Sequence, residues 1–419
     1  MSNNKKEIYL AVLIYPLWAL FLSFRHFRMS QAKNLFWLFC GFLGIIHIFS
    51  PEIMMDEYDG YRIAQQFVTF NQSTISWDTF FASFYREDGM FVDIYLPLTS
   101  YLLSLVTDNP RWLFFVFALV FGFFYSRNIW FMLDKFPERT GFPLVLLTLC
   151  FILICPIWII DGGRMGTAIQ VFVYGALPCL YNADKSKLIW CFAALLVHFS
   201  MIIPLSVLLL YYFIPKSINP LLCFYVISLF ISELDLTFVR NFLYDYAPPF
   251  LLRRVDIYTN ETYAQNIMEA KSSLNFYVEG SKMIVRWVIT FLFLGVCLWG
   301  KESVKARKEL KELLCFSLFV YSISNVLSLI PSAGRFIVLS QMFSLASLIL
   351  FYAFIKQSKY EQKNLEVVFR LMPLLLLFPI IYSIRVGCDY YGVSLFSNPV
   401  AVLFVDDNQP LIQYIKSIF

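Results

Sequence analysis

Apolar residues fall into long runs that recur along the whole chain, with short polar breaks between them. A hydrocarbon core of ~30 Å needs about 20 apolar residues in each helix that crosses it. We therefore predict an all-α polytopic membrane protein with roughly 10–12 transmembrane helices, in which residues 1–419 form one integral membrane domain. The predicted spans are residues 8–23, 35–50, 111–131, 142–160, 164–181, a proline-broken pair over 188–213, 221–236, 283–299, 313–330, 335–354 and 366–383.

The orientation of these spans follows from the basic residues between them. Lysine and arginine gather in the segments FRHFRMSQAK, LDKFPERT, NADKSK, GKESVKARKELKE and KQSKYEQKN. The positive-inside rule places such loops in the cytoplasm. This leaves outer loops at about 51–110 and 237–282, and tight outer turns at 161–163 and 331–334.

Two of the apolar runs are predicted to be irregular. If every run crossed fully, GKESVKARKELKE would lie on the same side as the acidic segment PEIMMDEYDGYR. The short run 91–106 carries Asp93 and Pro97, and is predicted to be a re-entrant or interfacial element. The run 188–213 is predicted to be a pair of half-spans that turns near His198 and Pro204.

Composition excludes several classes of protein. With 59% hydrophobic residues, 15% charged residues and a mean hydropathy of +0.66, the chain cannot bury its apolar surface in one water-soluble core. The net charge of +4 comes with basic residues in short loops between spans, so no nucleic-acid surface is expected. The nine cysteines show neither CxxC nor metal-ligand spacing, and we expect no metal and no cofactor.

Two tight outer turns each keep one arginine directly after a glycine. The segment DGGRM carries Arg164 and the segment PSAGRF carries Arg335, each at the predicted start of a helix. Free N–H groups and the helix dipole favour an anion there, and a guanidinium adds a bidentate clamp for phosphate. Two such turns could bind the two phosphate groups of a diphosphate. Alternatively, each arginine reaches lipid headgroups or pairs with a nearby acid such as Asp161.

Acids and tyrosines follow the second predicted span. In carbohydrate sites, carboxylates accept hydrogen bonds from hydroxyls and aromatic rings cover sugar faces. A solvated acidic loop explains the same composition. The second long outer segment also carries paired arginines, which could face headgroups or an anionic glycan. The candidates are Asp56, Tyr58, Asp59 and Tyr61 in the first loop, and Arg253 and Arg254 in the second.

His198 lies in LLVHFSMIIP, at the predicted helix break. An unperturbed pKa of ~6.5 suits a histidine to remove a proton near neutral pH, as a general base or as a group that orients an acceptor. The alternative is a buried neutral histidine bonded to a backbone carbonyl. His47, in GIIHIF, has no helix break or anion site beside it and is interpreted as a packing residue.

These segments, in this order, resemble the bacterial polysaccharide polymerases of the Wzy and EpsG type. The resemblance covers most of the chain and rests on DEYDGY, EDGMFVDIYLPL, GRMGTA, KSK, LLVHFSMIIPL and GRF. Arg164, Ala168, His198 and Ser200 match the family's arginine-led helix and its H-x-S segment, and Arg335 matches more loosely. Glycines flank Arg164 where the family usually shows a larger residue and then glutamine.

The resemblance implies a glycosyltransferase of membrane-embedded, C-type architecture in the bacterial inner membrane. Such an enzyme joins O-antigen or capsular repeat units carried on undecaprenyl diphosphate, on the outer face and without a metal. Arg164 and Arg335 would stabilise the leaving group, and His198, Asp56 or Asp59 would take the acceptor proton. The expected partners are the lipid-linked oligosaccharide, the bilayer and a chain-length regulator protein.

Two other functions share these features. A flippase or other transporter of lipid-linked sugars also uses broken helices and charged groups. An O-antigen ligase shares the arginines and differs in its acceptor. The chain shows no inverted repeat, and its candidate ligand-binding residues gather on one side, which favours an enzyme over a transporter.

Overall fold

The computed structural model describes residues 12–49, 59–73, 76–85, 93–231, 275–330, 333–358, 362–405 and 409–418, with isolated positions between 232 and 274. Four predicted site residues lie outside the described residues: Asp56, Tyr58, Arg253 and Arg254.

The described elements are helices. The first half contains α2 (Pro16–Arg25), α3 (Ala32–Ile45), α4 (Asp59–Gln72), α5 (Trp77–Tyr85), α6 (Tyr95–Ser104), α7 (Pro110–Leu133), α8 (Phe142–Ile154), η2 (Ile157–Gly162), α9 (Met165–Tyr181), η3 (Lys185–Lys187), α10 (Leu188–Val197), η4 (Phe199–Met201) and α11 (Ile202–Tyr211). The second half contains α12 (Ile218–Ser228), α16 (Phe276–Trp299), α17 (Lys301–Lys305), α18 (Lys308–Leu327), α19 (Arg335–Gln357), α20 (Lys363–Leu371), η5 (Met372–Leu376), α21 (Leu377–Gly387), η6 (Val393–Phe396), η7 (Ala401–Phe404) and α22 (Leu411–Ile418).

Six helical segments of the described chain are long and apolar enough to cross a membrane. They are Pro110–Leu133, Phe142–Gly162, Phe276–Trp299, Lys308–Leu327, Arg335–Gln357 and Lys363–Gly387. Four further apolar helices are shorter: Ala32–Ile45, Met165–Tyr181, Phe199–Tyr211 and Ile218–Ser228. The predicted all-α polytopic fold is therefore confirmed.

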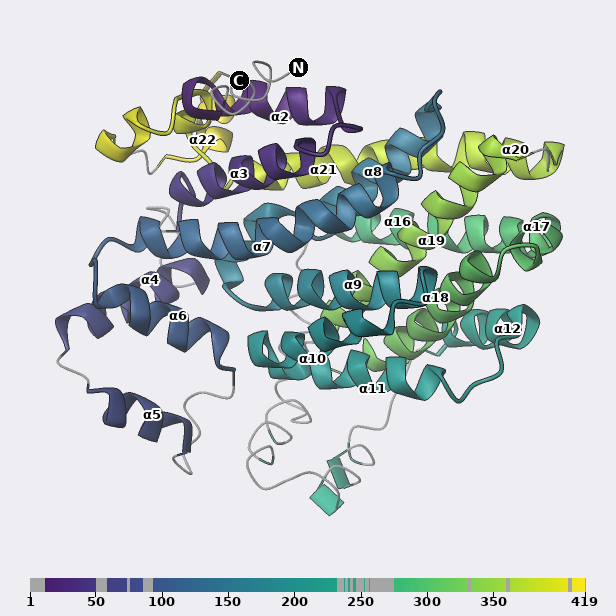
Figure 1. Ribbon diagram of the computed structural model, residues 1–419, viewed down its shortest axis with the longest axis horizontal. Helices are drawn as coiled ribbons and strands as arrows, with labels where there is room; N and C mark the ends of the chain where they lie inside the picture. Colours follow the sequence, from purple (N-terminus) through teal and green to yellow (C-terminus); the bar gives the residue numbers. More distant parts are fainter. Residues whose placement is uncertain are drawn as a thin grey trace.

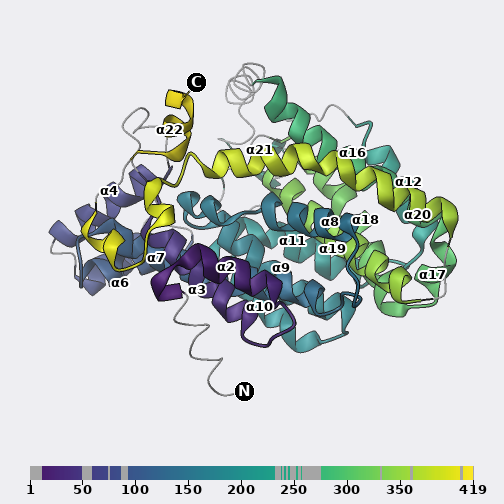
Figure 2. The same cartoon turned by 90° about the horizontal axis from the view of Figure 1, so that it is seen from above.

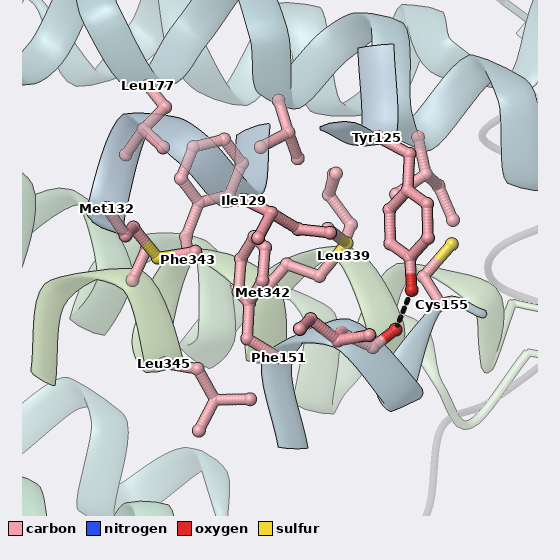
Figure 3. Close-up of a cluster of buried hydrophobic side chains, with 14 of the residues drawn as sticks. Tyr125, Ile129, Met132, Phe151, Cys155, Leu177, Leu339, Met342, Phe343 and Leu345 are labelled. Atoms are coloured by element: carbon pink, nitrogen blue, oxygen red, sulfur yellow. Dashed lines mark hydrogen bonds between the residues drawn. The ribbon is translucent and has the colours of Figure 1, made fainter. Parts of the chain in front are cut away.

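The core forms where α7, α8, α9 and α19 pack together. Helix α7 begins with Pro110 at its first position, and the Asn109 side chain accepts a hydrogen bond from the Arg111 N–H, which is a favourable helix start. Figure 3 shows side chains from these helices interdigitating around Ile129 and Phe343. Within this cluster, the buried Tyr125 hydroxyl donates to the backbone carbonyl of Ile152 (2.6 Å), which satisfies a polar group that water cannot reach.

The pairing of α3 with α7 depends on a glycine. A Cβ added at Gly44 would lie 2.5 Å from the backbone carbonyl oxygen of Phe114, so the two helices approach more closely than a side chain would allow.

The basic loops meet at one end of the molecule. Arg28 donates to the Pro137 carbonyl (2.8 Å) and Gln357 donates to the Lys135 carbonyl (2.8 Å), which joins three of the five basic segments. Helices α17 and α20 lie at this end, and α4 and α6 lie at the opposite end (Figures 1 and 2). These basic segments therefore gather at one end of the bundle, as the loop pattern predicts.

Both predicted irregular runs are irregular in the structure. Helix α10 ends at Val197, η4 follows, and α11 begins at Ile202, so the break at His198 is confirmed. Pro204 lies in the first turn of α11 rather than at the break. Its missing N–H costs nothing there, because the first N–H groups of a helix have no partner within the helix. Helix α6 has 10 residues and is about 15 Å long, too short to cross a hydrocarbon core of ~30 Å.

Candidate functional site

Four polar side chains form a continuous chain at the end opposite the basic loops. Arg164 Nη1 lies 2.6 Å from Asp93 Oδ2. The other oxygen, Asp93 Oδ1, lies 3.4 Å from His198 Nδ1. Nε2 of the same histidine lies 3.3 Å from Arg335 Nη1. Three of these residues are predicted site residues that the fold brings together, and Asp93 is the residue that connects them.

Asp93 is positioned by the helix break. The backbone N–H of Ile94 donates to the Leu196 carbonyl (3.1 Å), which holds the start of α6 against the end of α10. The N–H of Phe199, at the start of η4, donates to Asp93 Oδ1 (2.6 Å). A break in a helix leaves backbone donors that need partners. The Asp93 carboxylate supplies one, so the same group stabilises the break and orients His198.

Arg164 is positioned by the glycine before it. Gly163 has φ +69°, a left-handed conformation that residues with a Cβ rarely adopt, and Arg164 is the N-cap residue of α9. A Cβ at Gly163 would also lie 3.0 Å from Ile63 and 3.1 Å from Leu96. The paired glycines thus turn the chain sharply enough for the guanidinium to reach Asp93. Arg335, by comparison, is the first residue of α19.

The neighbours of His198 select one tautomer. Asp93 can only accept from Nδ1, and the Arg335 guanidinium can only donate to Nε2. Both contacts favour the tautomer that has its proton on Nδ1 and its lone pair on Nε2. Nδ1 lies 3.4 Å from Asp93 Oδ1 without forming a hydrogen bond in the described part of the chain, so this contact is electrostatic. Nε2 is then the basic nitrogen.

The Asp93 carboxylate is stabilised in its charged form. Burial acts to raise the pKa of this carboxyl, but His198, the Phe199 N–H and the Arg164 charge outweigh it and hold the pKa below its ordinary value. The Asp93 side chain is fully buried, whereas the Arg164 side chain is 35% exposed. Asp93 therefore serves as a fixed anion, and Arg164 keeps one face open to a ligand.

Asp161 pairs with His47 rather than with Arg164. His47 Nε2 lies 3.2 Å from Asp161 Oδ1, and both residues are buried. The histidine ring stacks on Tyr390, with centroids 5.5 Å apart. The sequence interpretation of His47 as a packing residue is therefore incomplete, because its partner is 114 positions away in the chain. This pair holds Asp161 in place before the glycine turn, and Arg164 follows that turn.

Two predicted residues of the first outer loop are described, and they lie outside the chain of four. Asp59 pairs with Arg62 on the exposed surface of α4. The Tyr61 hydroxyl accepts a hydrogen bond from Gln65 (2.9 Å) on the same exposed helix. A Cβ at Gly162 would lie 3.9 Å from Asp59 Oδ2, which places this acid beside the glycine turn.

Among the residues that the structure describes, no group of three or more His, Cys, Asp or Glu side chains could hold a metal ion. The charges beside His198 are supplied instead by the two guanidiniums and by Asp93.

A large apolar groove extends from Arg335. It has a volume of about 790 Å³ and lies between α8, α9, α16, α18, α19 and α21. Its lining is largely aliphatic and includes Leu153, Ile154, Ile337, Val338 and Ile380. Arg335 is therefore shared by the groove and by the His198 site.

Sequence reasoning missed two charged residues, Asp93 in the chain of four and Arg286 in the lining of the groove. Each had a signal, because each is an ionisable residue within an otherwise apolar segment, and such residues usually face a protein interior or cavity. The pattern could not show which partner each one meets.

Comparison with known proteins identifies one family. A family model described as "EpsG family" matches residues 68–397, which is most of the chain. The matched range contains all four residues of the site. The searches of curated proteins and of solved structures gave no match.

Proposed function

The chain belongs to the EpsG family, a family of Wzy-like polymerases, and from this premise we propose that it polymerises oligosaccharide repeat units carried on undecaprenyl diphosphate. The product is an O-antigen or a capsular polysaccharide. In the reaction, an acceptor hydroxyl attacks the anomeric carbon of the donor sugar. The bond from that carbon to the diphosphate oxygen breaks, and the hydroxyl proton passes to a base.

The outer face of the inner membrane is the proposed location of this reaction. The site lies at the end of the bundle opposite the basic loops, and basic loops between spans are cytoplasmic by the positive-inside rule. A chain-length regulator protein is the proposed partner on that face.

His198 is the proposed general base. Asp93 beside Nδ1 and Arg335 beside Nε2 both favour the tautomer with its lone pair on Nε2. Acid–base groups of this kind contribute ~10²- to 10⁴-fold to a rate. Asp56 and Asp59 are the alternative bases, and of these Asp59 is exposed and paired with Arg62.

Arg164 and Arg335 are the proposed clamp for the diphosphate. Negative charge grows on the bridging oxygen as the glycosidic bond breaks, and a fixed donor for such charge contributes ~3–4 kcal/mol. Guanidiniums supply this stabilisation without a metal ion. Glycan contacts are proposed for the outer-loop residues Tyr58, Tyr61, Arg253 and Arg254.

The single observation that carries this proposal is the chain Arg164–Asp93–His198–Arg335 on one end of a membrane bundle. The test is to delete the gene and separate the surface glycan on a gel. One repeat unit per carrier is the expected result for a lost polymerase. Unattached polymer would identify a ligase, and complete absence of surface glycan would identify a flippase; either outcome overturns the proposal.

A further inference from the structure

The groove beside Arg335 contains a second arginine that the reaction described above does not use. Arg286 lies ten residues after the start of α16, about 15 Å along the helix. An arginine at such depth in an apolar helix usually faces a cavity and marks a ligand or ion pathway. Arg286 faces the groove, together with Lys282, Glu279 and Asn325.

The polar atoms at this end of the groove are incompletely paired. Arg286 Nη2 donates to the Leu229 carbonyl (3.3 Å), but its Nε is buried without a hydrogen-bond partner in the described part of the chain. Asn325 donates from Nδ2 to Ser228 (2.9 Å), and its Oδ1 is likewise buried without a partner there. Buried polar groups are normally satisfied, and the Arg286 Nε–H can only donate, so this atom indicates that a ligand with an acceptor oxygen completes this position.

The charges identify the ligand as an anion. Lys282, Arg286 and Arg335 contribute three positive charges to the lining, and Glu279 contributes the one negative charge. Glu279 is paired with Lys282 (3.1 Å), and the positive charges of the lining outnumber its negative charge. The rest of the lining is mainly apolar, with a few uncharged polar side chains such as Ser281 and Gln341, over a volume of about 790 Å³. A molecule that matches both parts has a dianionic head and a long hydrocarbon tail.

We propose that this groove binds the polyprenyl diphosphate of the donor, with the diphosphate between Arg286 and Arg335 and the isoprenoid tail along α8, α19 and α21. This inference rests on the proposed function and adds the place where the lipid binds. Arg335 contacts both the groove and His198. A diphosphate at Arg335 therefore brings the anomeric carbon of the donor sugar close to His198, the proposed general base. Arg164, held by Asp93, contacts the same diphosphate from the other side.

The test is direct binding of undecaprenyl diphosphate, without sugar, to the purified full-length protein. We expect Arg286→Gln to weaken binding ~10- to 100-fold, the effect of losing a charge-assisted contact. Val338→Trp should weaken binding by filling the groove without changing charge. Arg370→Gln is the matched control, because Arg370 is 74% exposed at the basic end. The affinity for undecaprenyl monophosphate should fall less in the Arg286→Gln variant than the affinity for the diphosphate.

Three outcomes would overturn the inference. Arg286→Gln could bind with unchanged affinity while unfolding at a lower temperature, which would assign Arg286 only to capping of α12 through Leu229. Val338→Trp could leave affinity unchanged. Excess phosphatidylglycerol could displace the probe, which would assign the groove to bulk lipid. Because the probe carries no sugar, binding succeeds or fails independently of polymerisation, and the gene-deletion gel tests polymerisation separately.

Discussion

Asp93→Asn is the most informative single substitution. It keeps the shape of the side chain and an oxygen for the Phe199 N–H, and it removes the charge. The asparagine amide can donate to His198 Nδ1, which favours the opposite tautomer, with a proton on Nε2 facing Arg335. The base then has no lone pair at the reacting nitrogen. We expect the rate of glycosyl transfer to fall ~100- to 1000-fold, within the range of acid–base contributions.

The cost in stability should be smaller than the cost in rate. Removing one partner of a fully buried ion pair costs ~3–5 kcal/mol. Arg164 is 35% exposed and regains water, so we expect about 1.5–3 kcal/mol, the value of a hydrogen bond to a charged group. The Asp93 pKa is lower in the folded protein than in the unfolded chain, so its stabilisation is present above the unfolded value of ~3.9. It should disappear as the pH falls through the folded-state pKa.

The assay is a glycan ladder from a deletion strain carrying each variant at matched membrane abundance, with a rate measured on purified protein. Asp134→Asn, in an exposed position after α7, is the control and should give a full ladder. The double variant Asp93→Asn/His198→Gln should be no slower than the slower single variant, because both act on one base. A normal ladder and rate from Asp93→Asn would refute the assignment of Asp93 as the positioning residue.

Three further predictions test the site and its side of the membrane. His198→Gln should keep normal abundance and lose at least ~100-fold in rate; near-normal polymer would return this histidine to a packing role. Arg164→Lys keeps the charge but loses the bidentate fork, so it should be clearly impaired, and Arg164→Ala should lose ~100- to 1000-fold; a full ladder from the lysine variant would exclude this arginine from the clamp. A cysteine at Asp108 should react with an impermeant thiol reagent in intact cells, and one at Lys305 should not; the reverse pattern would place the site in the cytoplasm.

Local patterns in the sequence are sufficient to predict the helices and the places where they break. The length of each apolar run is set by the thickness of the bilayer, and this single constraint predicts segments such as α7 and α19 within a few residues. The glycine turn before Arg164 and the break at His198 are also local, because a left-handed glycine or an interrupted hydrogen-bond ladder acts over a few residues.

The partners of these residues were decided only by tertiary structure. Asp93 meets Arg164 across 71 positions, and His198 meets Arg335 across 137. No periodicity encodes such pairs, since they depend on which helix ends the packing of α7, α9, α10 and α19 brings together. Sequence reasoning therefore found the cations and the histidine but missed the buried acid that connects them. An acid in an apolar run is visible in the sequence, but the charge that it neutralises becomes identifiable only when the helices are packed.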